Sequence, residues 1–298
     1  MESNKTYHLK DIIFVFLPVF LAAILQYVAV IGDILVLFLR NLISDTRTVG
    51  SRSIGTIMTQ DFNQPMNTAY LSLAQYTLFI LCFGIWYYRS FIKKTNKDEV
   101  SLLSEITASF HNLFTTIAPL FLVICGYTGQ LFVDGVLALC RPVFPNAFAA
   151  YDKLLGNVTG ASTSIIMMLA VILLAPIGEE LLFRGLILKY ANRCMPAFVS
   201  ILLQALLFGL YHGNVIQGIY AFALGIVLGL LAHRYDSVLP GILLHVVINL
   251  SILFIPKGLF SETTSCIITT IITFAVFILS LIWVLHKKSP RPERPISD

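Results

Sequence analysis

Two adjacent glutamates and an arginine stand within an otherwise apolar stretch of the chain. Gly178–Gly185 reads GEELLFRG, and the segment before it, Ser164–Ile177, has no charged residue. On a helix, Glu180 and Arg184 are four residues apart and share a face, whereas Glu179 lies about 100 degrees away. We therefore predict that Glu180 pairs with Arg184, and that Glu179 stays free to face a cavity and act as a general base. The competing interpretation is that all three charges snorkel to water from a helix end.

Two further apolar stretches carry polar side chains of a kind that supports hydrolysis. FGLYHGN, Phe208–Asn214, ends an apolar helix at His212, and Gly213 is a plausible helix stop. HVVIN places His245 and Asn249 four residues apart, hence on one helical face within an apolar background. Taken alone, His212 is an interface residue in the simplest interpretation, and the other two are hydrogen-bonding links between membrane helices.

Taken together, the three stretches supply a carboxylate base, two imidazoles, a carboxamide and an ion pair. These groups are sufficient for activation of a water molecule and for stabilisation of an oxyanion. Between the second and third stretches, Ala221, Gly225 and Gly229 form a seam of small residues at four-residue spacing. Such a seam allows neighbouring helix backbones to approach closely, which would bring the polar stretches into one site.

The elements that position these residues are predicted to be membrane-spanning helices. Of the 298 residues, 57% are hydrophobic and only 12% are charged, whereas soluble domains are about 25% charged. Uncharged stretches of about 20 residues recur, and lipid requires such stretches to be helical. We predict an all-α, polytopic transmembrane helix bundle of about eight spans enclosing an intramembrane cavity. The expected spans are Ile12–Leu39, Tyr70–Tyr88, Leu113–Leu139, Thr163–Tyr190, Pro196–His212, Val215–Ala232, Leu239–Ile255 and Cys266–Leu285.

The distribution of Lys and Arg predicts that both termini are cytoplasmic. With the N-terminus inside, six of these residues fall in outer segments, namely Arg40, Arg47, Arg52, Arg141, Lys153 and Lys257. Thirteen fall in cytoplasmic segments, which is the bias that membrane proteins show. Asn41–Asn67 is expected to be a polar outer loop, and Arg141–Gly160 a second one that can lie on the membrane surface. The proline-rich tail Ser289–Asp298 is expected to be disordered.

The motifs APIGEELLFRG, FGLYHGN and HVVIN resemble, in this order, the three motifs of the CPBP family of intramembrane proteases. That family comprises the Rce1-like CAAX prenyl endopeptidases and the bacterial Abi-type relatives linked to bacteriocin processing. The resemblance covers about Ser162–Phe254, with Glu179, Glu180, Arg184, Phe208, His212, His245 and Asn249 at the motif positions. It implies that Glu179 is the general base, that His212 helps to hold the water, and that His245 and Asn249 stabilise the oxyanion. Glu180, Arg184 and Phe208 would support the site.

The resemblance implies an enzyme that hydrolyses a peptide bond of a membrane-associated peptide or protein, in the lipid bilayer of a bacterial plasma membrane. No nucleic acid, cofactor or metal ion is expected, although Glu179 and the two histidines could ligate zinc. Two rival functions are a non-catalytic membrane immunity or binding protein, and a transporter with a proton relay. We divide the chain into an N-terminal transmembrane region (1–161), a catalytic core (162–255) and a last helix with a cytoplasmic tail (256–298).

Overall fold

The chain folds into a bundle of helices. The computed structural model describes residues 9–44, 64–93, 113–159, 164–256 and 258–286, with residues 62, 107 and 109–111 as isolated positions. These residues contain no β-strand, so the predicted all-α fold is confirmed. The predicted outer loop Asn41–Asn67 lies largely outside the described residues, and the tail Ser289–Asp298 lies wholly outside them.

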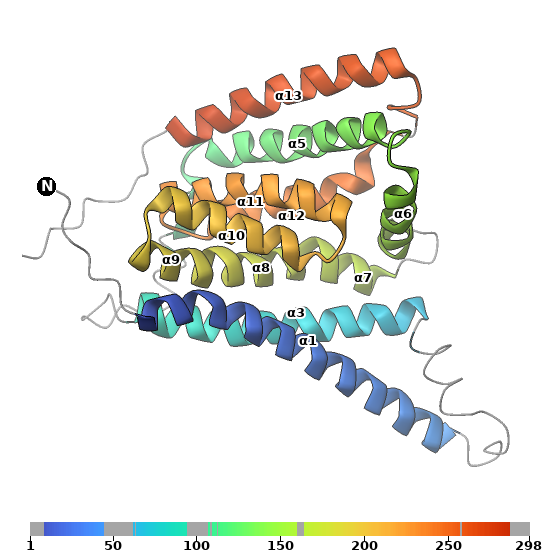
Figure 1. The fold of residues 1–298 in the computed structure, drawn as a ribbon, viewed down its shortest axis with the longest axis vertical. Helices are drawn as coiled ribbons and strands as arrows, with labels where there is room; N and C mark the ends of the chain where they lie inside the picture. The colour runs from blue at the N-terminus through green and yellow to red at the C-terminus, as the bar shows by residue number, and fades with distance from the viewer. Residues whose placement is uncertain are drawn as a thin grey trace, which may run out of the picture.

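The long helices run roughly along one axis, and α1 diverges from the others toward its C-terminal end (Figure 1). In chain order the elements are α1 (Leu9–Ser44), α3 (Pro65–Tyr87), η1 (Tyr88–Ile92), α5 (Ala118–Cys140), α6 (Pro145–Thr159), α7 (Ile165–Leu169), η2 (Ala170–Leu174), α8 (Ala175–Glu180), η3 (Leu181–Ile187), α9 (Leu188–Cys194), α10 (Ala197–Tyr211), α11 (Val215–Tyr235), α12 (Leu239–Ser251), η4 (Ile252–Phe254) and α13 (Thr263–His286).

Apolar helices occupy the positions of all eight predicted spans, but they differ in length. Six segments of the described chain are long and apolar enough to cross a membrane. The other two predicted spans are shorter, because α10 has 15 residues and α12 has 13 before the turn η4. At about 1.5 Å per residue, helices of these lengths extend only about 20–23 Å, which is less than the hydrocarbon thickness of about 30 Å. The start of α1 and the end of α13 lie on the same side of the bundle (Figure 1).

One continuous helical segment, Ile165–Cys194, carries the GEELLFR sequence and passes through the middle of the fold. It includes two wider π-type turns, η2 and η3, on either side of α8. Helix α3 packs along this segment through two glycines. A Cβ atom at Gly178 would lie 3.1 Å from the Cβ of Phe79, and one at Gly185 would lie 3.3 Å from the Tyr87 ring. Small residues thus allow α3 to approach the segment that carries both glutamates.

The region predicted as a second outer loop is a helix. Helix α6 runs across the direction of α5, at the opposite side of the bundle from the start of α1 (Figure 1). Its apolar face places Phe148 and Tyr151 against Ile216 of α11. Arg141 donates two hydrogen bonds to Asp152, of 2.6 and 2.9 Å, and this contact lowers the pKa of the Asp152 carboxyl below its usual value. The segment is therefore an amphipathic helix that docks on the end of the bundle.

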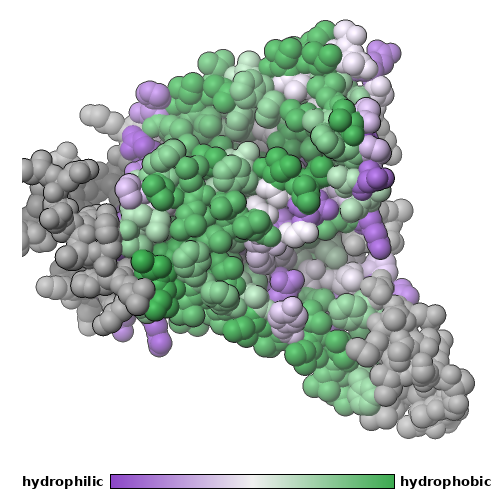
Figure 2. All heavy atoms as spheres, viewed as in Figure 1, coloured by the Kyte–Doolittle hydropathy of each residue, from purple (hydrophilic) through white to green (hydrophobic). Residues whose placement is uncertain are grey.

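The outer surface of the bundle is apolar, as expected for a protein in contact with lipid. Large hydrophobic side chains are exposed along α1, α3 and α13, among them Phe20, Leu81 and Leu279. Figure 2 shows one face that is mostly hydrophobic, with hydrophilic residues at its two ends and a smaller hydrophilic patch between them. The buried polar residues lie in the interior, so the bundle places its polar chemistry away from lipid.

Candidate active site

The predicted ion pair is present and is fully buried. Arg184 Nη1 donates to Glu180 Oε1 at 2.7 Å, and the side chains of both residues are 0% exposed. Glu179, one residue earlier, points to other partners. A buried arginine that lacked this carboxylate would carry an uncompensated charge in a medium of low dielectric constant. The pair therefore fixes the side chain of Glu180 and leaves Glu179 available.

The predicted seam of small residues joins α11 to α10. A Cβ atom at Gly225 would lie 2.9 Å from the Cα of Ala205, so only glycine permits this approach. The Gly225 carbonyl then accepts hydrogen bonds from Gln204 Nε2 at 2.7 Å and from Arg184 Nη2 at 3.4 Å. The seam thus brings a backbone acceptor to the arginine of the ion pair, in addition to packing two helices.

Phe208 provides the apolar surface on which the charged and imidazole groups of the site rest. The Arg184 guanidinium carbon lies 4.3 Å from the centroid of the Phe208 ring, a distance typical of a cation–π contact. The rings of His212 and His245 contact the same phenyl ring in T-shaped arrangements, with centroid distances of 4.8 and 5.8 Å. Phe208 is fully buried, so its ring separates the two imidazoles at a fixed spacing.

His245 links both glutamates from α12. Its Nδ1 donates to Glu180 Oε1 over 3.2 Å, and its Nε2 lies 3.8 Å from Glu179 Oε2. Glu180 Oε1 therefore accepts from Arg184 and from His245 at once. Space for this arrangement comes from Gly241, one turn before His245, because a Cβ atom there would lie 2.6 Å from Glu180 Oε2. The supporting glutamate thus orients the imidazole as well as binding the arginine.

His212 follows the last residue of α10, where the helix ends. The next residue, Gly213, has φ of 64°, a left-handed conformation that glycine adopts without strain and that stops the helix. His212 Nδ1 lies 2.8 Å from the Phe208 carbonyl oxygen. A carbonyl can only accept, so Nδ1 carries the proton, and in the neutral ring Nε2 has a free lone pair. That nitrogen can accept a hydrogen bond from water.

Asn249 is anchored to the central segment by a carbonyl that the helix itself leaves free. Its Nδ2 donates to the Val171 oxygen at 2.9 Å. In the π-type turn η2, the Ala175 N–H bonds to Ala170, and the next residue, Pro176, has no N–H to offer Val171. The Val171 carbonyl therefore needs another donor, and Asn249 supplies it. The second amide hydrogen of Asn249 remains available to a ligand.

Glu179 has a different set of neighbours from Glu180. The hydroxyl of Tyr76, on α3, donates to Glu179 Oε1 over 3.4 Å, while Oε2 is the oxygen that faces His245. The residue is 5% exposed. Its two carboxylate oxygens thus point toward groups on two other helices, and no residue of its own helix pairs with it at ion-pair distance in the described structure.

Comparison with known families identifies the region that holds these residues. Residues 161–251 match the family model described as Type II CAAX prenyl endopeptidase Rce1-like. We call this part of the chain the Rce1-like segment. The predicted resemblance to the CPBP family is thereby confirmed for that segment, and it is a resemblance to intramembrane proteases. No curated protein and no solved structure matches the chain.

Glu179, His212 and His245 are the side chains of this site that could ligate zinc. Among the described residues, no group of three or more His, Cys, Asp or Glu side chains is placed to hold a metal ion. His212 uses Nδ1 to bond the Phe208 carbonyl, and His245 uses Nδ1 to bond Glu180. These bonds leave Nε2 of each ring as the nitrogen that could ligate a metal ion together with Glu179.

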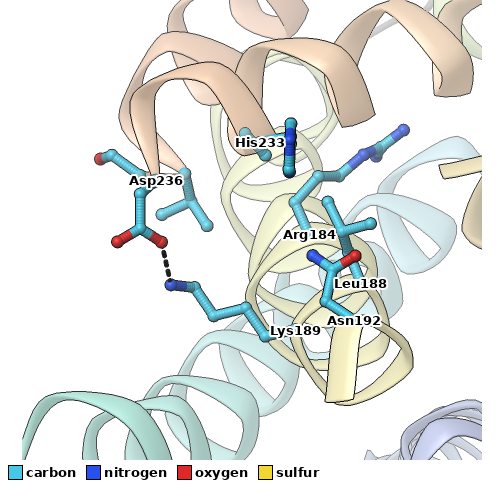
Figure 3. A pocket seen from close by; sticks show the side chains of 9 residues that line it. Arg184, Leu188, Lys189, Asn192, His233 and Asp236 are labelled. Carbon is cyan, nitrogen blue, oxygen red and sulfur yellow. Dashed lines mark hydrogen bonds and ion pairs between the residues drawn. The ribbon is translucent and has the colours of Figure 1, made fainter. Parts of the chain in front are cut away.

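A separate pocket of about 210 Å³ lies between the ends of α9 and α11. Figure 3 shows Lys189 reaching Asp236 across it, and their ion pair measures 2.8 Å. Asn192 and His233 line the same pocket, and the stem of Arg184 forms part of its wall. None of Glu179, His212, His245 and Asn249 lines it. Arg184 is thus the one residue of the candidate active site that also lines this pocket.

The structure adds three contributors that the motifs do not reveal. Tyr76 lies outside the Rce1-like segment, 103 residues before Glu179, and no local pattern marks it. The Val171 carbonyl becomes available only through the combination of a π-type turn with Pro176. Gly241 has a signal in the sequence, since it precedes His245 by four residues and shares its helical face. A small residue one turn away from a polar side chain, on the same helical face, indicates that room is left there for the hydrogen-bond partner of that side chain.

Proposed function

We propose that the protein is an intramembrane endopeptidase in which Glu179 activates water. The observation that carries this proposal is the placement of the Glu179 carboxylate, which is buried in a membrane-spanning segment between Tyr76 and His245. The neighbouring carboxylate, Glu180, is already engaged by Arg184 and His245. One carboxylate is thus held in place and the other is available for proton transfer.

The reaction begins with a water molecule held beside Glu179. The Glu179 carboxylate accepts a proton from this water, and His212 Nε2 accepts its second hydrogen in a hydrogen bond. The hydroxide oxygen attacks the carbonyl carbon of the scissile peptide bond, and the carbonyl oxygen becomes an oxyanion. Glu179 then donates its proton to the leaving nitrogen as the C–N bond breaks. The products are a carboxylic acid and an amine, so one water is consumed for each bond.

His245 and Asn249 stabilise the oxyanion in this proposal. His245 turns Nδ1 to Glu180, so its Nε2 points toward the Glu179 side of the site. The proposal requires an N–H at Nε2 as well as at Nδ1, that is, a ring with both nitrogens protonated. Asn249 keeps one amide hydrogen after bonding the Val171 carbonyl. Two donors of this kind, in a site without bulk water, supply a large part of the rate enhancement of peptide hydrolysis.

The proposed cellular setting is a bacterial plasma membrane with both termini in the cytoplasm. This orientation is supported by the excess of Lys and Arg in the segments on one side and by the common side of the start of α1 and the end of α13. The substrate is a membrane-associated peptide. One candidate is a prenylated carboxyl-terminal sequence, the substrate class of the matched family. In a cell without prenylated proteins, the second candidate is a hydrophobic leader peptide.

A cleavage assay tests the proposed function. The purified chain in lipid vesicles is incubated with a farnesylated CAAX peptide, with the same peptide lacking the prenyl group, and with a hydrophobic leader peptide. Mass spectrometry is expected to show cleavage of one of these peptides, and the Glu179→Gln variant is expected to leave it intact. Binding of a peptide without cleavage by either protein would instead support a non-catalytic binding function.

A further inference from the structure

Tyr76 contributes to the candidate active site from a helix outside the Rce1-like segment. Its hydroxyl donates to Glu179 Oε1 over 3.4 Å. Among the described residues, Tyr76 is the one side chain that donates a hydrogen bond to the Glu179 carboxylate, because His245 Nε2 lies 3.8 Å from the other carboxylate oxygen. Whatever holds the carboxylate in one orientation must therefore include α3.

The contact between Tyr76 and Glu179 is supported on both sides. On α3, the Tyr76 ring meets the Phe79 ring edge to face, with centroids 6.0 Å apart. On the central segment, Gly178 precedes Glu179 and packs against the Phe79 side chain, as its missing Cβ allows. The aromatic pair and the glycine thus set the distance between α3 and α8, and with it the position of the tyrosine hydroxyl.

We propose that Tyr76 is a positioning residue for Glu179. Its hydroxyl holds Oε1, so that Oε2 is presented to the water and to His245. A carboxylate side chain without this donor can rotate among several orientations, and only some of them face the substrate. This inference rests on the proposed role of Glu179 as the base. It assigns part of the active site to the N-terminal region, which the family match does not cover.

The alternative is a structural role, in which the Tyr76 hydroxyl only provides a hydrogen-bond partner for a buried polar group. The two roles differ in their kinetic consequence. A residue that positions the base affects kcat and leaves KM nearly unchanged, because the substrate binds before proton transfer. A residue that only supports packing affects the melting temperature and the amount of folded protein. A displacement of about 1 Å at a reacting group can cost about 100-fold in rate.

The test is the Tyr76→Phe variant, which keeps the ring and removes only the hydroxyl. We expect kcat to fall about 10- to 100-fold, with KM within about twofold and an unchanged melting temperature. The matched control is Tyr70→Phe, also on α3, where the side chain is half exposed. This control should retain the kcat of the unmodified protein.

The remaining outcomes each have a defined meaning. An unchanged kcat in Tyr76→Phe, together with an inactive Glu179→Gln variant, would overturn the assignment of Tyr76 and leave the proposed function intact. A rise in KM at constant kcat would also overturn it, because it would place Tyr76 in substrate binding. Full activity of Glu179→Gln would overturn the proposed function itself, and the role of Tyr76 with it.

Discussion

Two ion pairs of nearly equal length lie in different parts of this bundle. Arg184 and Glu180 are 2.7 Å apart in the centre, and Arg141 and Asp152 are 2.6 Å apart at the end that carries α6. The central pair is fully buried and shares its atoms with His245 and the Gly225 carbonyl. The side chains of the outer pair are 48% and 47% exposed. The same kind of contact thus lies within the candidate active site in one place and holds a surface helix against the bundle in the other.

The difference lies in what surrounds each pair. Around the central pair, the further hydrogen bonds cross to other helices, and removal of either partner leaves a buried charge or a buried polar atom without a partner. Around the outer pair, water can replace either partner. We therefore expect substitutions in the central pair to have large effects on stability, and substitutions in the outer pair to have small ones.

Loss of the central arginine should be the most destabilising change. Arg184→Ala leaves Glu180 buried without its charged partner, so we expect the free energy of unfolding to fall by about 3–5 kcal/mol. Arg141→Ala should cost less than about 1 kcal/mol, because its partner remains in contact with water. Both are measured by unfolding of the purified protein in detergent. Equal losses for the two variants would remove the distinction between the two regions.

Removal of an oxyanion donor should affect turnover more than folding. Asn249→Ala is expected to reduce kcat about 100- to 1000-fold, with a smaller loss of about 1–3 kcal/mol in the free energy of unfolding because the Val171 carbonyl loses its donor. Asn192→Ala, in the separate pocket beside His233, is the matched control and should not change kcat. If the Asn249→Ala protein is unstable but its folded fraction has the kcat of the unmodified protein, Asn249 contributes to helix packing and not to oxyanion stabilisation.

An added methyl group should distinguish the crowded centre from the open surface. Gly241→Ala places a Cβ atom 2.6 Å from Glu180 Oε2, which Arg184 and His245 prevent from moving freely. We expect a cost of about 1–3 kcal/mol in the free energy of unfolding. Gly156→Ala on α6 meets no atom within 4 Å and should be neutral or stabilising by about 0.5–1 kcal/mol. The reverse order would contradict the packing described for the site.

The smallest expected effect concerns pH at the outer helix. The hydrogen bonds from Arg141 lower the pKa of Asp152, so its ionised form stabilises the folded state at pH values above the ordinary 3.8. This stabilisation should be lost as the pH falls from 3.8 through the lower pKa that Asp152 has in the folded state. Since both side chains are half exposed, the effect should be under about 1 kcal/mol. Asp152→Asn should abolish this acid-dependent part of the unfolding curve.

The sequence predicts the fold well because apolar length is a local property. Each apolar run of about 20 residues becomes a helix in lipid whatever its neighbours are, so the positions of the eight apolar helices follow directly. The pairing of Glu180 with Arg184 is also local, since it depends only on a four-residue spacing. Helix α6 was missed because its amphipathic pattern is mixed with loop-forming residues such as Pro145 and Asn146.

The remaining features of the site depend on contacts between distant helices. The donation from His245 to Glu180 joins residues 65 apart, and the contact of Tyr76 with Glu179 joins residues 103 apart. No periodicity or motif specifies which helices become neighbours. The anchoring of Asn249 depends on a change of helical register at η2, which the proline alone does not predict.

The central claim is that Glu179, and not a bound metal, activates the attacking water. The most direct measurement is the cleavage rate of the purified protein before and after extended dialysis against a strong chelator, together with its zinc content. Our account predicts an unchanged rate, well under one zinc per chain, and no cleavage by Glu179→Gln in either condition. Stoichiometric zinc, with activity lost on its removal and regained on its return, would contradict it.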